Sequence, residues 1–339
     1  MNKNHVFVSI PNNIERSTFF TPMIMNYIEN IKEFTVTFNP YNRQLTEDEK
    51  RYFLKDKDAL VVGWGCGKYS SEMLKQEPKL KVMGVLGGAI QPYIDEDFFN
   101  LEERFIITGA KVMARSVAEA VLTYTLTSLR DISNYDHKMK RVEKWRSNDF
   151  FNEGLFYKKV GFIGLGQVGR FVLEMLKPFN VKVSIYDPYV SDEEIQSING
   201  KKVSLEELMT TSDVISVHAA LTQETFHLIN KENLKLMKKG ALLVNTARGG
   251  IIDEQALIHI LKQGYIKAAL DVYEEEPLGK ESKLRSLENV LLIPHMAGPT
   301  IDMRQYMTLD ILHRFQSYFQ SGKIDDYITK EKYKIMTSN

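Results

Sequence analysis

Three apolar runs in the second half of the chain each end with a residue that can do acid–base or anion chemistry. Arg248 follows the first run, the acidic stretch Glu274–Glu276 follows the second, and His295 follows the third. An imidazole titrates near neutral pH and can exchange a proton with a hydroxyl or carbonyl oxygen. A guanidinium can bind a carboxylate through two hydrogen bonds, and a carboxylate bonded to the imidazole would favour its charged form. These residue types together predict proton transfer beside a bound carboxylate.

Each of these residues also has a structural interpretation. A histidine after a proline often packs, an arginine after a strand often forms a surface ion pair, and consecutive glutamates often form a solvated run. The three apolar runs, however, have the length and residue types of successive strands in a parallel sheet. The carboxyl ends of such strands line one crevice, so their joint placement favours a shared site.

A glycine motif precedes these segments and has the context of a dinucleotide site. The apolar run at 159–163 leads into Gly164, Gly166 and Gly169, and a helical pattern follows. The three glycines suit a tight turn, a close backbone approach to a pyrophosphate and close helix–strand packing, in that order. The helix N-terminus supplies a positive dipole end for the phosphates. The alternative is a glycine-rich structural turn.

An acidic residue ends the next strand candidate, 181–186. Asp187 follows Gly169 at the spacing at which a carboxylate accepts a hydrogen bond from a ribose 2′-hydroxyl. It would repel the 2′-phosphate of NADP, and no arginine immediately follows it. The sequence therefore favours NAD as the cofactor.

Short β-branched runs alternate with amphipathic stretches along most of the 339 residues, which predicts an α/β protein with parallel sheets. We expect two doubly wound, Rossmann-like domains, because the length suits about two domains. Strand candidates lie at 5–10, 35–38, 59–63, 82–86 and 104–108, then at 159–163, 181–186, 214–218, 242–245, 268–272 and 290–293. A helix is expected over 116–132 with Ser116 as its N-cap and Glu119 three residues on. The helical pattern at 301–320 is expected to pack back onto the first domain, which would then be discontinuous.

The order of these motifs resembles the D-2-hydroxyacid dehydrogenase family, which includes D-lactate, glycerate and 3-phosphoglycerate dehydrogenases. The resemblance covers most of the chain and is densest over 159–300. It implies a flavodoxin-like substrate-binding domain at 1–110 and 299–339 and an NAD-binding Rossmann domain at 111–298. It also implies an NAD-dependent enzyme that interconverts a 2-oxo acid and a D-2-hydroxy acid.

The resemblance assigns roles to individual positions. Arg248, Glu276 and His295 correspond to the family's catalytic residues, and only the family spacing selects Glu276 over Glu275. The residues expected at the cofactor are Gly164, Gly166, Gln167, Val168, Gly169, Asp187, His218, Thr222, Thr246 and Asp271. The residues expected at the substrate are Gly65, Gly87, Gly88 and Arg248. The helix at 116–132 resembles the start of the family's dimer-forming helix, so a homodimer is expected.

The sequence departs from the family in the two substrate loops. Ala89, Ile90 and Gln91 stand where polar and acidic residues are usual, just after Gly87 and Gly88. Trp64 stands beside Gly65, where phosphoglycerate-using relatives tend to carry an arginine. Trp64 either signals a different or bulkier substrate or packs the domain. The reaction class therefore follows from the resemblance, whereas the identity of the substrate does not.

Composition limits the remaining function classes. Lysine plus arginine equals aspartate plus glutamate at 44 each, so no global charge would attract nucleic acid or an anionic membrane. The single cysteine, Cys66, cannot form an intramolecular disulfide or by itself build a metal site, and we interpret it as a packing residue. No signal peptide or membrane-spanning run is found, so a cytoplasmic location is expected.

Two other functions remain to be weighed against an oxidoreductase. A dinucleotide-sensing, corepressor-type binding protein could carry the same fold and could even keep the three catalytic residue types. A methyltransferase-like Rossmann domain would leave Arg248, Glu276 and His295 unexplained. Turnover of a 2-oxo acid with NADH separates the first alternative from an enzyme.

Overall fold

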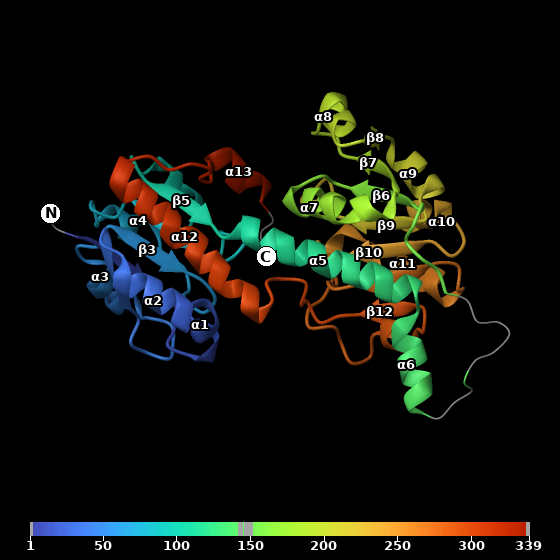
Figure 1. Ribbon diagram of the computed structural model, residues 1–339, viewed down its shortest axis with the longest axis horizontal. Coiled ribbons are helices and arrows are strands. Elements are labelled where there is room, and N and C mark those ends of the chain that lie inside the picture. Colours follow the sequence, from blue (N-terminus) through green and yellow to red (C-terminus); the bar gives the residue numbers. More distant parts are fainter. Residues whose placement is uncertain (1–2, 142–144, 146–151, 337–339) are drawn as a thin grey trace. The chain divides into compact units, whose positions relative to one another are not determined.

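The computed structural model describes residues 3–141, 145 and 152–336 of the chain. The chain forms two compact units, of which the first is Met1–Met113 with Pro299–Asn339 and the second is Ala114–Gly298. Each unit is built on one parallel sheet, with five strands in the first and seven in the second (Figure 1). The expected fold class, two doubly wound α/β units with the smaller one discontinuous, is confirmed.

The sheet of the first unit has the strand order β2-β1-β3-β4-β5. Its strands are β1 (Asn4–Val8), β2 (Phe34–Phe38), β3 (Ala59–Val62), β4 (Val82–Val85) and β5 (Phe105–Thr108). The central strands β3 and β4 are buried at every position, as expected for a parallel sheet covered on both faces. Their apolar runs are the signal by which the sequence predicted them.

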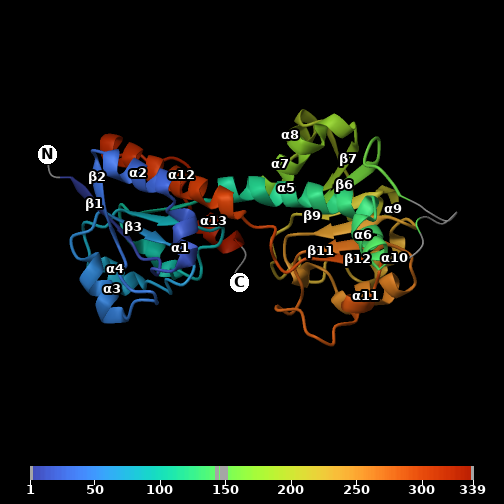
Figure 2. The ribbon, with the colours of Figure 1, turned by 60° about the horizontal axis from the view of Figure 1, so that its bottom comes forward.

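Helices from both ends of the chain cover this sheet. They are α1 (Ile14–Phe19), α2 (Pro22–Asn30), α3 (Glu47–Leu54), α4 (Ser71–Lys75), α12 (Ile301–Ser321) and α13 (Lys330–Ile335), with the 3-10 helix η1 (Glu96–Asn100). Figures 1 and 2 show α12 lying alongside α2. The side chains of Met307, Ile311 and Phe315 on α12 are buried in the core of the first unit. Gly84 on β4 makes room for them, since a Cβ there would lie 2.5 Å from a methyl carbon of Ile311.

The sheet of the second unit has the strand order β12-β11-β10-β9-β6-β7-β8. Its strands are β6 (Lys159–Ile163), β7 (Lys182–Tyr186), β8 (Gly200–Lys202), β9 (Val214–Val217), β10 (Leu242–Asn245), β11 (Lys267–Leu270) and β12 (Val290–Leu292). The sequence predicted six of these strands. It missed β8, a three-residue edge strand whose two lysines give no apolar run.

Helices cover both faces of the second sheet. They are α5 (Ala110–Leu129), α6 (Ile132–Lys140), α7 (Gln167–Leu176), α8 (Asp192–Ser197), α9 (Leu205–Thr211), α10 (Lys231–Leu236) and α11 (Glu254–Lys262), with the 3-10 helices η2 (Lys177–Phe179), η3 (Gly249–Ile251) and η4 (Lys283–Ser286). Buried residues of α5, α7 and α8 belong to one apolar cluster, and those of α9, α10 and α11 belong to the other.

One local expectation is wrong. Ser116 is not an N-cap, because α5 begins at Ala110 and Ser116 lies inside it, 3% exposed. Its hydroxyl instead donates to the carbonyl oxygen of Gly298 at 3.2 Å, which joins the first helix of the second unit to its last residue. His227 lies in a turn with a positive φ of 50°.

Candidate active site

The three residues predicted to be catalytic all follow strands at the carboxyl edge of the second sheet. Arg248 lies after β10, Glu276 after β11 and His295 after β12, and these three strands are neighbours in the sheet. The loops after parallel neighbouring strands lie side by side at one edge. The three residues therefore follow neighbouring strands at one edge of one sheet, as their apolar runs predicted.

His295 and Glu276 form a hydrogen-bonded pair. Nδ1 of His295 lies 2.6 Å from Oε2 of Glu276, and both side chains are partly exposed. An ionised carboxylate only accepts, so Nδ1 carries a hydrogen and Nε2 is the nitrogen that can exchange a proton with a substrate. The residues alone could not decide between Glu275 and Glu276 as the partner of His295. Among the hydrogen bonds between described residues, Glu275 makes none with His295.

The backbone at His295 is held in an uncommon conformation by Asp271. His295 has a positive φ of 51°, and its amide donates to the carbonyl oxygen of Asp271 at 2.9 Å. The Asp271 carboxylate accepts from the amides of Met296 and Ala297 at 2.7 and 3.0 Å. Burial raises the pKa of this carboxyl, and the two amide hydrogen bonds oppose that shift. Asp271 thus fixes the His295 loop, a contribution that the sequence did not reveal.

Arg248 lies in a loop that Asn245 braces. The fully buried Asn245 side chain donates to the carbonyl oxygen of Arg248 at 2.9 Å and accepts from the amide of Ala247 at 3.0 Å. The Arg248 guanidinium donates to the carbonyl oxygen of Ala247 at 2.7 Å. Burial lowers the pKa of Arg248, and the nearby charge of Glu276 opposes this. A largely desolvated guanidinium binds an anion more strongly than one in water does.

A hollow of about 610 Å³ opens beside the His295–Glu276 pair, within the second unit. It is lined by Tyr273, Glu276, Pro277, Leu278, Arg285, Leu292, Ile293, Pro294 and His295. The pair is therefore accessible from the surface of this unit rather than enclosed in its core.

The glycine turn has the geometry of a pyrophosphate cradle. Gly164 has a φ of +87°, and a Cβ there would lie 2.7 Å from the amide nitrogen of Ala219, so only glycine fits. Gly166 caps α7 without any side-chain hydrogen bond, and the nearest atom to a Cβ there would be 4.0 Å away. The first amides of α7, at Gln167 and Val168, thus begin a helix whose end is open to an anion. These residues fit the diphosphate of a dinucleotide.

Asp187 follows β7 directly and lies next to this turn. Its Oδ2 accepts from the amide of Leu165 at 2.8 Å, and its Oδ1 accepts from the amide of Tyr189 at 2.8 Å. These bonds fix the carboxylate beside the glycine turn and leave further lone pairs for ribose hydroxyls. Its position suits the 2′-hydroxyl contact that the sequence predicted.

The remaining predicted cofactor residues lie on loops at the same edge. His218 follows β9, and its ring stacks on that of Phe162 with the centroids 5.2 Å apart, close to Gly169 of α7. The Thr222 hydroxyl takes part in a local turn with Thr225. Thr246 follows β10 directly and is partly exposed. Their roles toward a cofactor stay predictions.

The predicted substrate glycines belong to the first unit, also after strands. Gly65 follows β3 with a φ of +78°, and Gly87 and Gly88 follow β4. The unusual residues of these loops have structural partners. Gln91 donates to the carbonyl oxygens of Tyr333 and Met336, which fastens α13, and Trp64 packs edge-on against Phe19 and beneath the Arg304 guanidinium.

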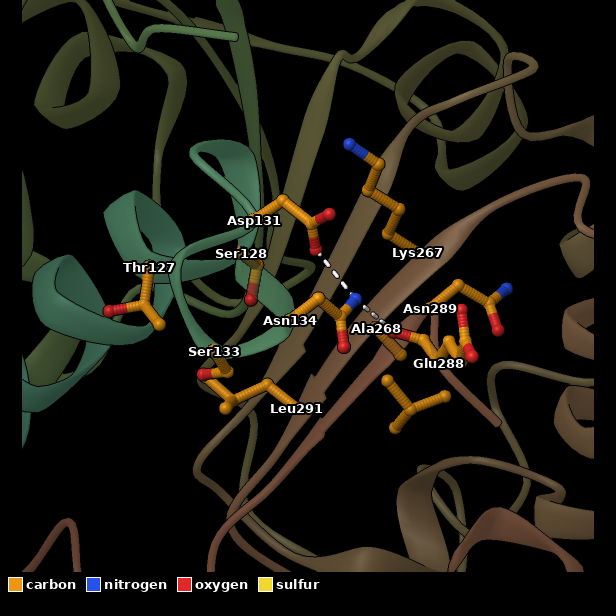
Figure 3. Close-up of a pocket in the computed structure, with 11 residues that line it drawn as sticks. Thr127, Ser128, Asp131, Ser133, Asn134, Lys267, Ala268, Glu288, Asn289 and Leu291 are labelled. Atoms are coloured by element: carbon orange, nitrogen blue, oxygen red, sulfur yellow. Dashed lines mark hydrogen bonds between the residues drawn. The ribbon is translucent and has the colours of Figure 1, made fainter. Parts of the chain in front are cut away.

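A second, smaller cavity lies at the amino edge of the second sheet, away from the candidate site. It measures about 200 Å³ and is lined by residues from the end of α5, from α6 and from the starts of β11 and β12 (Figure 3). Asn134 spans it by donating to the Asp131 carboxylate and to the carbonyl oxygen of Glu288. None of the predicted site residues lines this cavity.

Within the described part of the chain, no helix is both long and apolar enough to cross a bilayer. Burial of Cys66 raises the pKa of its thiol to about 12, so the thiol stays protonated in the core as expected of a packing residue.

Comparison with known proteins gives one consistent family. The model for the NAD binding domain of D-isomer specific 2-hydroxyacid dehydrogenases matches residues 122–297. The D-3-phosphoglycerate dehydrogenase of Methanocaldococcus jannaschii is 38% identical over 76% of this chain and 48% of its own length, so the chain spans about half of that relative. The glyoxylate reductase of Thermofilum pendens is 37% identical over 75% of this chain and 76% of its own length.

Solved structures agree on the fold. The structure of D-2-hydroxyisocaproate dehydrogenase superposes with a TM-score of 0.80 at 23% identity, covering 96% of this chain and 99% of that one. An acyclic imino acid reductase in complex with NADPH and D-Arg superposes with a TM-score of 0.75 at 26% identity, covering 96% and 99% of the two chains.

Proposed function

From the premise that the chain belongs to the D-isomer specific 2-hydroxyacid dehydrogenase family and carries its NAD-binding domain, we propose that it interconverts a 2-oxo acid and a D-2-hydroxy acid. The observation that carries this proposal is the His295–Glu276 pair at 2.6 Å, formed between the loops after β12 and β11, next to the Arg248 loop after β10. In the reducing direction the balance is one 2-oxo acid, one NADH and one proton to one 2-hydroxy acid and one NAD.

The chemistry that the cofactor supplies when bound is hydride transfer at C2 of the substrate. His295 donates a proton from Nε2 to the C2 oxygen in reduction and removes it in oxidation. Glu276 accepts from Nδ1, which orients the ring and stabilises the imidazolium. Arg248 binds the substrate carboxylate and polarises the C2 oxygen.

The open helix end at Gly166 and the carboxylate of Asp187 support binding of NAD. Asp187 would accept from a ribose hydroxyl and repel a 2′-phosphate, so NAD is preferred over NADP. Gly65, Gly87 and Gly88 are proposed to hold the substrate through their backbone amides. The two closely matched relatives act on different acids, phosphoglycerate and glyoxylate by name, so overall identity does not select between them.

The test is turnover of NADH with a panel of 2-oxo acids that includes glyoxylate, hydroxypyruvate, pyruvate and a branched-chain 2-oxo acid. We expect at least one to be reduced and the rate to fall about 10²- to 10⁴-fold in His295→Gln, with NADH binding by fluorescence retained. His259→Gln, a change to an exposed histidine on α11, is the matched control. NADH binding without turnover of any oxo acid by the unmodified protein would instead favour the dinucleotide-sensing alternative.

We also propose a homodimer formed through the region of α5 and α6. Large apolar side chains are exposed on α6, which follows α5, and beyond it: Ile132 is 53%, Met139 46% and Trp145 83% exposed in the single chain. A second copy that covered them would remove this apolar area from water. Light scattering of the intact protein tests this, and Ile132→Asp should shift the mass towards the monomer. The cytoplasmic location remains a prediction.

A further inference from the structure

The three consecutive glutamates after Tyr273 have three different environments. Glu276 pairs with His295, as described. Glu274 forms a second carboxylate–imidazole pair, in which its Oε1 lies 2.7 Å from Nε2 of His227. Glu275, between them, is exposed. Two imidazoles therefore anchor one short segment from its two ends, and only one of them belongs to the proposed reaction.

The Glu274 side chain joins three segments of the second unit. Its Oε1 accepts from His227 in the loop after β9 and also from the amide of Glu254 at the start of α11, at 3.0 Å. Glu254 returns the contact, since its Oε2 accepts from the amide of Glu274 at 3.3 Å. Side-chain exposure at Glu274 and His227 is only about one third, so water competes less for these bonds than at the open surface.

His227 is itself fixed on its own loop. Its backbone has a φ of 50°, and its amide donates to the carbonyl oxygen of Gly250 at 2.8 Å. Its ring stacks on that of Phe226 with the centroids 4.0 Å apart. Gly250 is two residues after Arg248, so His227 contacts the Arg248 loop through its backbone and the Glu276 segment through its ring.

The Arg248 loop and the Glu276 segment are in direct backbone contact. A Cβ at Gly249 would lie 1.9 Å from the carbonyl carbon and oxygen of Tyr273, so the two backbones touch at the residue next to Arg248. The amide of Tyr273 donates to Oε1 of Glu276 at 3.0 Å, while Oε2 of the same carboxylate holds His295. The position of Tyr273 therefore sets the distance between Arg248 and the Glu276 carboxylate.

We propose that His227 and Glu274 are a positioning pair, which clamps the Tyr273–Glu276 segment against the Arg248 loop and so keeps Glu276 aligned with His295. This inference rests on the proposed function, because the pair acts through Arg248, Glu276 and His295. His227 itself transfers no proton to the substrate. Without the clamp the segment would keep its fold and lose the fixed spacing of the three residues.

The test compares variants that remove the bond with variants that keep it. His227→Ala and Glu274→Ala remove it, whereas His227→Gln keeps a donor and Glu274→Gln keeps the oxygen that accepts from His227 and Glu254. We expect the alanine variants to lower kcat about tenfold or more, because small misplacements of reacting groups are costly. NADH affinity by fluorescence should stay within about twofold, and the glutamine variants should retain most of kcat. Glu275→Ala is the matched control and should have no effect.

Two further measurements make the outcome decisive. The double variant His227→Ala with Glu274→Ala should lose no more kcat than Glu274→Ala alone, because removing Glu274 already breaks its contact with His227. The ring-proton resonances of His295, assigned with His295→Gln, should shift in His227→Ala and not in His259→Ala, whether or not turnover is seen.

An alanine variant that keeps kcat within twofold, or that leaves the His295 resonances unmoved, overturns the positioning pair. Equal losses of kcat, NADH affinity and thermal stability would show a general structural role instead and would also overturn it. The unmodified protein could reduce no oxo acid while the His295 resonances still shift in His227→Ala. That result would overturn the proposed function and leave the positioning pair standing.

Discussion

The buried imidazole of His218 should make the second unit sensitive to mild acid. Both ring nitrogens are buried and have no hydrogen-bond partner among the described residues, and the ring stacks on Phe162. Burial lowers the pKa of His218 to about 3. In the unfolded chain the same group has a pKa of about 6.5. Folded His218 therefore stays neutral at pH 5, whereas the unfolded chain gains a proton there.

The size of the effect follows from this difference in proton uptake. Below pH 6.5 the unfolded state binds a proton that the folded state does not, so stability falls with pH from about 6.5 down to about 3. When the pH falls from 8 to 5, protonation stabilises the unfolded state relative to the folded state by roughly RT ln(1 + 10^1.5), which is about 2 kcal/mol. Above pH 6.5 both states carry a neutral ring and the contribution is constant.

The assay is urea unfolding of the intact protein and of His218→Phe at pH 8 and pH 5. Phenylalanine keeps a ring beside Phe162 and removes the titration. Because the two units need not unfold together, the relevant transition is the one whose midpoint rises with NADH in the unmodified protein. Between pH 8 and pH 5 the free energy of unfolding should fall by about 2 kcal/mol more in the unmodified protein than in the variant. An acid sensitivity that is the same in both proteins would refute the reasoning, and His259→Phe is the control for loss of a histidine.

Three other predictions concern the candidate site. Glu276→Gln should lower kcat about tenfold to a hundredfold by removing the charge that stabilises the His295 imidazolium, and Glu275→Gln should not, as measured by steady-state kinetics. Gly249→Ala should destabilise the protein by roughly 1–3 kcal/mol or more in thermal unfolding, because its Cβ would overlap the backbone of Tyr273, while Gly279→Ala, with open space around it, should be neutral. Asp187→Asn should narrow the preference for NADH over NADPH in fluorescence titrations, with Asp192→Asn as the control, and an unchanged ratio would contradict the role given to Asp187.

The elements that position the site were predictable because their signals are local. Buried parallel strands such as β6 and β10 show as short apolar runs, and both were predicted with the bounds that they have in the structure. The predicted start of the helix at 116–132 was wrong because a capping pattern in the sequence does not by itself decide where a helix begins. Ser116 and Glu119 match a capping box by spacing alone, yet the helix-forming residues before Ser116 allow α5 to begin a turn and a half earlier.

The parts of the site that escaped prediction depend on contacts between distant loops. Nothing in the run of three glutamates tells which carboxylate meets His295 and which meets His227, since that depends on how the loop after β11 turns. The bracing by Asn245 and Asp271 was missed for the same reason. A buried polar residue at a strand end was the available signal, because such a group must find hydrogen-bond partners when the fold forms.

The division of the first unit between the two ends of the chain has a consequence for synthesis on the ribosome. Its sheet is complete once β5 has emerged. The apolar face that α12 covers stays uncovered, however, while about 185 residues of the second unit are made. At about 5–20 residues per second that delay is roughly ten to forty seconds. The second unit lies between the two parts of the first unit in the sequence, so all of its residues are synthesised before the first unit is complete. The nascent first unit is therefore the part of this protein that a chaperone would have to shield.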